Sequence, residues 1–124
     1  MGPGGAITLL IVRPAVGIGQ SGCLLAIRSG GIVLGDRFGG ITDQDVLHCV
    51  TEFGIMVISP EYRLAPAHPA PAGVDDCYAT LEWIAAEFGI DPGRIVVSGV
   101  SGGGGLAAGA VLMARDNDGP AVLA

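Results

Sequence analysis

A serine between glycines is the residue of this 124-residue chain whose surroundings best suit covalent chemistry. Ser101 lies in Gly99-Val-Ser-Gly-Gly103, which fits the pattern Gly-x-Ser-x-Gly. A strand-forming run precedes the pattern and an Ala- and Leu-rich helical run follows it. A strand, a sharp turn and a helix in this order hold a serine hydroxyl exposed at the end of a sheet. The glycines let the two backbones pass more closely than a Cβ permits. The pattern therefore predicts a nucleophile at Ser101.

The base that would activate this serine is the missing part of the pattern. A serine hydroxyl is a weak nucleophile until a neighbouring base accepts its proton. No histidine follows Ser101, and both histidines of the chain precede it. His48 lies in an expected helix and His68 in a proline-rich loop, and we expect neither to act as the base. We expect Asp75 and Asp76 to cap a helix, where its dipole favours carboxylates.

The elements that must position Ser101 alternate between strand and helix. The apolar patterns predict strands at Ile7–Val12, Cys23–Ile27, Ile55–Ser59 and Ile95–Ser98, the start of another at Ala121–Ala124, and helices at Thr42–Phe53, Val74–Phe88 and Gly102–Arg115. Thr42 is the expected cap of its helix, with Asp43 and Asp45 in the first turn. Alternating units of this kind form a parallel sheet with right-handed crossovers. The mean hydropathy of +0.60 suits strands that are covered on both faces.

Composition excludes several classes of function. The net charge is −6 with six basic residues and no basic cluster, which argues against nucleic-acid binding. The apolar run Ala6–Val12 is much shorter than the roughly 20 residues of a membrane span, and it lacks the features of a secretory signal. The three cysteines, Cys23, Cys49 and Cys77, are widely spaced. We expect them to be small buried thiols in a cytoplasmic protein, without a metal site.

Three further segments occur in an order and spacing that resemble one family. They are Cys23–Asp36, a strand followed by a glycine loop; Ser59–Asp76, a proline-rich crossing from strand to helix; and Ile90–Ile95, before the strand that leads to Ser101. Together they resemble the hormone-sensitive-lipase-like carboxylesterases (alpha/beta hydrolase fold-3) over nearly the whole chain. The resemblance implies an α/β-hydrolase fold, a small-molecule carboxylic ester as substrate, an acyl-serine mechanism and no cofactor.

The resemblance also implies an oxyanion hole built from backbone N–H groups. In the family, two of these come from a His-Gly-Gly-Gly loop and one from the residue after the serine. Gly30 and Gly31 match the two donors of the loop, and Gly102 follows Ser101. These three residues are therefore the expected donors. Losing one such donor typically lowers turnover about 10²–10³-fold.

The chain departs from the family pattern at three positions near the site. Arg28 stands in place of the histidine of the loop, and Ser29 in place of its first glycine. If that position requires a positive φ, Ser29 strains the loop. Val100 stands where the family usually has an acidic residue. His68 matches a histidine that is common in the family's loop and has a structural role there as far as the resemblance goes.

The acid and the base of the family's triad follow the serine on loops after later strands. Residues 1–124 are therefore expected to form an incomplete α/β-hydrolase domain, a mostly parallel sheet with flanking helices, truncated after the helix behind Ser101. We expect such a chain to be inactive by itself. Its exposed sheet edge would favour self-association.

Two other classes of function remain open. One is a non-catalytic remnant or interaction module that keeps the fold without the reaction. The other is a dinucleotide-binding domain, because Gly17–Gly22 fits Gly-x-Gly-x-x-Gly and Asp36 follows at a suitable spacing. The segment after Gly22 reaches the next glycine loop too soon for a crossover helix, which argues against the second class. We expect Asp36 to be structural.

Overall fold

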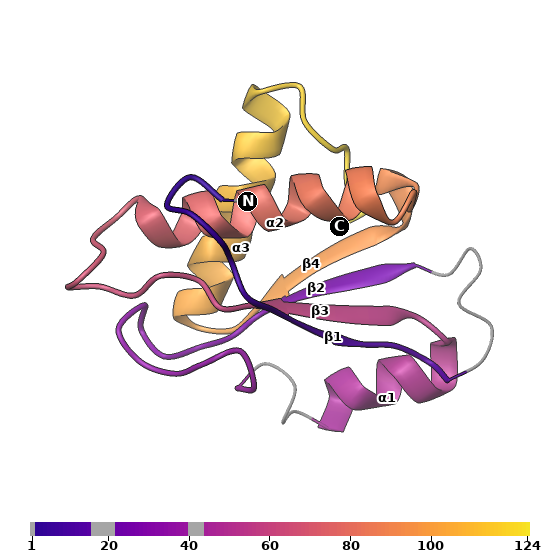
Figure 1. The fold of residues 1–124 in the computed structure, drawn as a ribbon. Coiled ribbons are helices and arrows are strands. Elements are labelled where there is room, and N and C mark those ends of the chain that lie inside the picture. The colour runs from indigo at the N-terminus through magenta and orange to yellow at the C-terminus, as the bar shows by residue number, and fades with distance from the viewer. Residues whose placement is uncertain (1, 16–21, 40–43) are drawn as a thin grey trace.

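The fold consists of one sheet with helices on both of its faces (Figure 1). A computed structural model describes residues 2–15, 22–39 and 44–124. The elements are β1 (Leu9–Val12), β2 (Cys23–Ile27), α1 (Gln44–Phe53), β3 (Met56–Pro60), α2 (Ala72–Glu87), a 3-10 turn (Pro92–Arg94), β4 (Ile95–Gly99) and α3 (Gly102–Asp116). The predicted alternation of strands and helices is confirmed, although most boundaries shift by a few residues. Thr42 and Asp43, the predicted first residues of α1, lie outside the described residues.

The strand order is β1-β3-β2-β4, and the sheet is mixed but mostly parallel. Strand β2 pairs in parallel with β3 and with β4, so the carboxyl ends of these three strands lie at one edge of the sheet. Strand β1 instead runs antiparallel to β3, with Leu9 opposite Pro60. The connection from β1 to β2, residues 13–22, is too short for the crossover helix that a parallel return requires.

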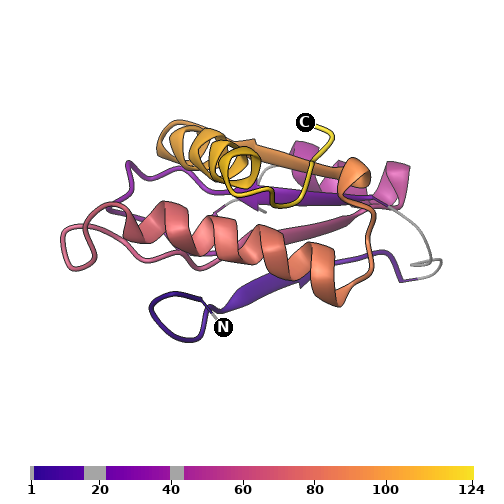
Figure 2. The same cartoon turned by 90° about the horizontal axis from the view of Figure 1, so that it is seen from above.

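Two apolar layers join the helices to the sheet. Helices α2 and α3 cover one face and α1 covers the other, as the two views show (Figures 1 and 2). Alternate residues of the central strands point to opposite faces. Leu25 and Ile58 therefore pack in the larger cluster with Leu81 of α2, whereas Leu24 and Val57 pack in the smaller cluster that includes Val50 of α1. Burial on both faces explains why the central strands read as continuous apolar runs.

The segment Ala121–Ala124 forms no regular strand, contrary to the sequence prediction. It nevertheless lies along β4. The N–H of Leu123 donates to the carbonyl of Ile95 at 2.9 Å, and the N–H of Val97 donates to the carbonyl of Ala124 at 2.8 Å. These two bonds are too irregularly spaced to form a ladder, so the segment covers the edge of β4 without extending the sheet.

The cysteines are free thiols, and Cys23 and Cys77 are buried as predicted, while Cys49 is half-buried. Burial raises the pKa of the Cys23 and Cys77 thiols to about 12, because a thiolate there would lose its hydration. In the described part of the chain no helix is long and apolar enough to cross a membrane.

Candidate active site

Ser101 lies in the turn that joins β4 to α3, at the edge of the sheet where the parallel strands end. Its side chain is exposed. Its backbone has φ 56° and ψ −122°, a combination that a residue with a Cβ rarely adopts. Such a conformation costs about 1–3 kcal/mol and persists only where the surrounding structure imposes it. The turn thus holds the serine in a strained and accessible position.

The glycines around Ser101 are required by close backbone approach. A Cβ added to Gly99 would collide with the carbonyl of Gly103. A Cβ added to Gly103 would collide with the carbonyl oxygens of Ile27 and Arg28, at the end of β2. Helix α3 can therefore begin directly against the ends of two strands only because these positions lack side chains.

This close packing predicts a contrast between two neighbouring glycines of α3. Gly103→Ala is expected to lower the free energy of unfolding by about 1–3 kcal/mol, because the new methyl group displaces the backbone of β2. Gly105→Ala is the matched control, since a Cβ there has no atom within 4 Å. Its expected effect is a gain of up to about 1 kcal/mol from the higher helix propensity of alanine. Urea denaturation measures both, and equal effects of the two substitutions would contradict the packing described.

The glycine loop after β2, residues 28–37, carries its backbone strain at Ile32. Gly30, Gly31 and Ile32 have successive positive φ values of 119°, 62° and 67°. Ser29 is not among the residues with a positive φ, so the condition under which Ser29 would strain the loop is not met. The strain falls on Ile32, whose carbonyl accepts a hydrogen bond from the N–H of Ala65 at 2.9 Å. A β-branched residue in this region is unfavourable, so contacts elsewhere must hold the loop.

The glycine loop and the serine turn lie against each other. A Cβ built on Gly102 would lie 3.1 Å from the backbone nitrogens of Gly31 and Ile32. Within the described ranges, the N–H groups of Gly30, Gly31 and Gly102 donate no hydrogen bond to the protein. Three amides without a protein acceptor are thus found in two adjoining segments beside Ser101. Such amides can stabilise the oxyanion of a tetrahedral intermediate.

The histidines do not complete a triad in this chain. His48 is exposed on α1, which covers the face opposite α3 (Figure 1). His68 is exposed in the loop between β3 and α2. No hydrogen bond joins either imidazole to Ser101 in the part of the chain that the structure describes. Asp36 accepts a hydrogen bond from the N–H of Phe38 at 2.9 Å, which gives it a place in a local turn.

The predicted capping role of Asp76 is wrong. Asp76 is 1% exposed and forms no cap; its carboxylate instead binds Arg63 in the loop after β3. The backbone N–H and the Nε of Arg63 each donate to Oδ2 at 2.9 Å, and Nη2 donates to Oδ1 at 2.9 Å. Asp75 does lie in the first turn of α2, where the carboxylate was expected. Sequence reasoning did not connect Asp76 with Arg63, which lies thirteen residues earlier and could have been considered as its ion-pair partner.

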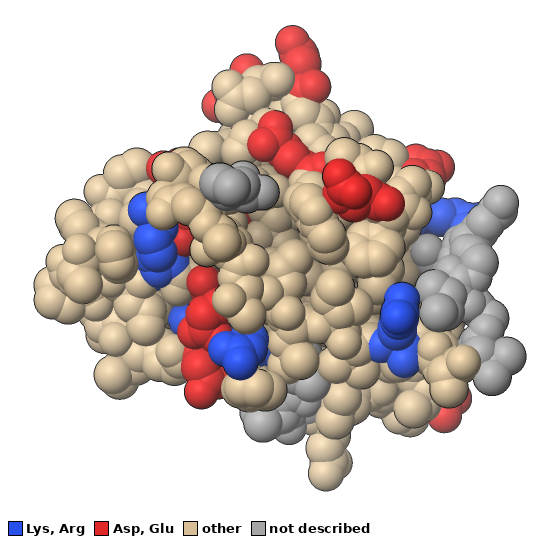
Figure 3. Space-filling model, viewed as in Figure 1, with Lys and Arg blue, Asp and Glu red and all other residues tan. Residues whose placement is uncertain are grey.

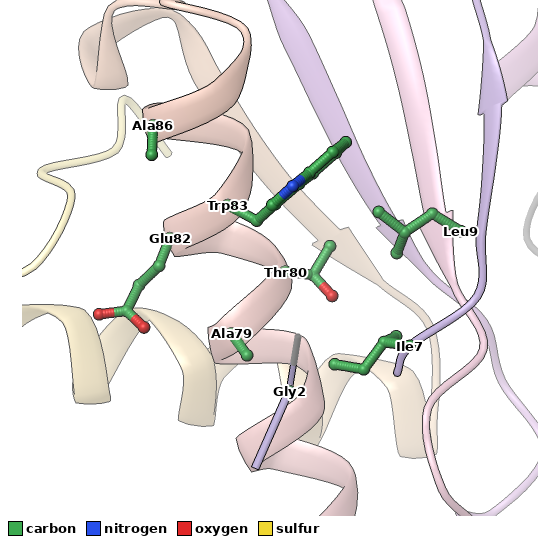
Figure 4. A pocket seen from close by; sticks show the side chains of 8 residues that line it. All are labelled: Gly2, Ile7, Leu9, Ala79, Thr80, Glu82, Trp83 and Ala86. Carbon is green, nitrogen blue, oxygen red and sulfur yellow. The ribbon is translucent and has the colours of Figure 1, made fainter. Parts of the chain in front are cut away.

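A pocket lies between α2 and the amino-terminal segment (Figure 4). Its walls are mostly apolar, with Trp83 of α2 facing Leu9 of β1. The lining residues are Gly2, Ile7, Leu9, Ala79, Thr80, Glu82, Trp83 and Ala86. Neither Ser101 nor the glycine loop contributes to it, so the pocket is not part of the candidate active site.

Neither a metal centre nor a nucleotide site emerges from the described residues. They contain no group of three or more His, Cys, Asp or Glu side chains placed to hold a metal ion. The segment after Gly22 is strand β2, not the helix that a dinucleotide fingerprint requires, and Gly17–Ser21 lie outside the described residues. Acidic and basic side chains are scattered over the face in Figure 3 and form no basic cluster there.

Comparisons with known proteins show which family has this fold. The sequence profile of the alpha/beta hydrolase fold family matches residues 24–124. The chain is 42% identical to the carboxylic ester hydrolase LipN of Mycobacterium tuberculosis, over 93% of this chain and 31% of LipN. A structure described as a bacterial heroin esterase is 43% identical with a TM-score of 0.84, over 94% of this chain and 37% of that one. An esterase of Pyrobaculum calidifontis is 36% identical with a TM-score of 0.85, over 98% of this chain and 39% of that one. The chain thus spans between 31% and 39% of the length of these three relatives.

Proposed function

We propose that this chain, which belongs to the alpha/beta hydrolase fold family, supplies the nucleophile and the oxyanion hole of a carboxylic ester hydrolase. One observation carries the proposal: the strained, exposed Ser101 is followed by Gly102, which lies against the glycine loop, and the amides of Gly30 and Gly31 in that loop donate no hydrogen bond to the described residues. Relatives named as ester hydrolases and esterases support the choice of substrate class. Strain at a single exposed serine has no evident structural purpose, whereas it is typical of a nucleophile.

In the proposed reaction, Oγ of Ser101 attacks the carbonyl carbon of the ester and its proton passes to a base. The tetrahedral oxyanion accepts hydrogen bonds from the backbone N–H groups of Gly30, Gly31 and Gly102. Collapse of the intermediate breaks the ester bond, and the alcohol leaves with the proton. Water then hydrolyses the acyl-serine to release the acid. Because no hydrogen bond joins His48 or His68 to Ser101 in the described part of the chain, we assign the base and the acid of the triad to the parts of the domain that the longer relatives have and residues 1–124 do not span.

The serine turn and the glycine loop both expose apolar side chains. Val100, directly before Ser101, is 66% exposed, and Leu34 in the glycine loop is 67% exposed. Val33 in the same loop is 49% exposed. Exposed apolar side chains on the two segments that carry the nucleophile and the proposed oxyanion donors favour a substrate with hydrocarbon parts.

The proposal is tested by comparing this chain with a completed one. In the completed chain, these 124 residues replace the aligned segment of the heroin esterase relative, which supplies the remaining parts of the domain. We expect the isolated chain to hydrolyse a short-chain aryl ester at close to the background rate, because an unactivated serine contributes little. The completed chain is expected to show steady turnover.

The comparison also separates the enzyme from the non-catalytic alternative. A completed chain that folds, as judged by circular dichroism, but gives no turnover would favour an interaction module with this fold. A robust activity of the isolated chain that depends on Ser101 would contradict the assignment of the base, and His48→Ala and His68→Ala would then identify it.

A further inference from the structure

Glu61, the residue after β3, binds the far end of the glycine loop. Its Oε2 accepts hydrogen bonds from the backbone N–H of Arg37 at 2.8 Å and from Nη1 of Arg37 at 3.1 Å. Arg37 is fixed a second time, because its carbonyl accepts a hydrogen bond from Oγ of Ser59 at 2.7 Å. The end of the loop is therefore attached to the exit of β3 by three hydrogen bonds, two of them to one carboxylate.

Glu61 also binds the near end of the loop through Arg28. Its Oε1 lies 3.6 Å from Nη2 of Arg28. Arg28 is buried, with only 2% of its surface exposed. Nη1 of Arg28 donates to the carbonyl of Pro60 at 2.9 Å, and the guanidinium lies 3.9 Å from the centre of the Tyr62 ring. The hydroxyl of Tyr62 donates in return to the carbonyl of Arg28 at 3.1 Å. A buried cation requires such compensation, and here Glu61 supplies the opposite charge.

The loop between these two attachments is the one that needs support. Its residues Gly30, Gly31 and Ile32 have positive φ values in succession, which a free loop would not keep. The carbonyl of Arg28 also lies where a Cβ on Gly103 would collide, so the start of the loop is packed under the serine turn. Fixing both ends of the loop therefore fixes its amides relative to Ser101.

We propose that Arg28, Glu61 and Arg37 form a clasp that positions the glycine loop for oxyanion stabilisation, with Glu61 as its central residue. The inference rests on the proposed function, since positioning matters only if the loop amides receive the oxyanion. Glu61 is a positioning residue that contacts no substrate. Donors must be held within about 0.5 Å of their productive places, so a loosened clasp lowers turnover more than it lowers substrate binding.

The test removes the charge of Glu61 in the completed chain. Glu61→Gln keeps an oxygen that can accept from Arg37 but loses the attraction to both guanidinium groups. We expect kcat to fall about 10-fold or more and KM to change less than about 3-fold, because the loop amides act mainly in the transition state. The matched control is Asp116→Asn, which removes the charge of an exposed pair, Arg115–Asp116, at the far end of α3. The control is expected to leave kcat unchanged.

A second measurement follows the loop directly in the 124-residue chain. Amide hydrogen exchange of Val33 and Leu34, whose N–H groups donate to the carbonyl of Gly30 at 3.2 and 3.0 Å, is expected to become about 10-fold faster in Glu61→Gln, while exchange in β2 and α2 stays as it was. Arg37→Gln is a second variant, which can be used if Glu61→Gln fails to fold, because the side chain of Arg37 is half-exposed. We expect it to show the same faster exchange in the loop and unchanged exchange in β2 and α2.

The outcomes distinguish the clasp from the proposed function. If Ser101→Ala abolishes turnover but Glu61→Gln and Arg37→Gln behave like Asp116→Asn in both kcat and loop exchange, the clasp is overturned. If Ser101→Ala leaves turnover intact, the proposed function fails whatever Glu61→Gln does. Loss of kcat together with faster loop exchange supports the clasp, whereas equally faster exchange throughout the chain would make Glu61 a general stabilising residue and overturn it.

Discussion

Ser101→Ala in the completed chain is expected to lower kcat by about 10³-fold or more, because no acyl-enzyme can form without the hydroxyl. KM should change little, since Oγ contributes mainly to the transition state. The turn keeps its conformation only if its surroundings impose φ 56° on alanine as they do on serine. Steady-state hydrolysis of an aryl ester measures the effect, and hydrogen exchange of α3 checks that the turn is intact.

Ser98→Ala is the matched control for the loss of a serine hydroxyl. Ser98 is also exposed and lies three residues earlier, in β4. We expect Ser98→Ala to change kcat less than about 2-fold, as for a surface substitution away from the chemistry. Retention of turnover in Ser101→Ala, or an equal loss in both variants, would refute Ser101 as the nucleophile.

Asp76→Ala is expected to lower the free energy of unfolding by about 3–5 kcal/mol, enough to unfold a small domain of ordinary stability. The carboxylate is buried and accepts three hydrogen bonds from Arg63, so its loss leaves the backbone N–H and the guanidinium of Arg63 without their acceptor. It also detaches α2 from the loop after β3. Urea denaturation followed by circular dichroism measures the change.

Asp116→Ala removes an ion pair of the same chemical type from the surface and is the control for Asp76→Ala. The side chains of Arg115 and Asp116 are 69% and 62% exposed, and such pairs contribute about 0–1 kcal/mol. The two substitutions should therefore differ by several kcal/mol. Similar midpoints of unfolding for both variants would show that the Asp76–Arg63 pair contributes no more to stability than the exposed pair does.

The local features of this protein could be predicted from its amino-acid sequence. Continuous apolar runs identified the buried strands, because a strand covered on both faces has no polar side to reveal. Gly54 and Gly89 directly follow the predicted helices Thr42–Phe53 and Val74–Phe88, and both have a positive φ, which glycine adopts without cost. The turn around Ser101 was predicted for the same kind of reason: its glycines, strand and helix are contiguous in the chain. The assignment of Gly30, Gly31 and Gly102 as oxyanion donors stays a prediction, as does self-association through the sheet edge.

Features that join distant residues could be seen only in the folded chain. The direction of β1 depends on its pairing with β3, and the role of Asp76 depends on Arg63, which reaches it from another element. The strain at Ile32 and the clasp around Glu61 likewise arise where the ends of β2 and β3 meet. Sequence patterns report on a residue and its near neighbours, through propensity and periodicity. A buried charge or a strained turn is instead stabilised by whichever groups the fold brings to it, and their identity is fixed by packing in space.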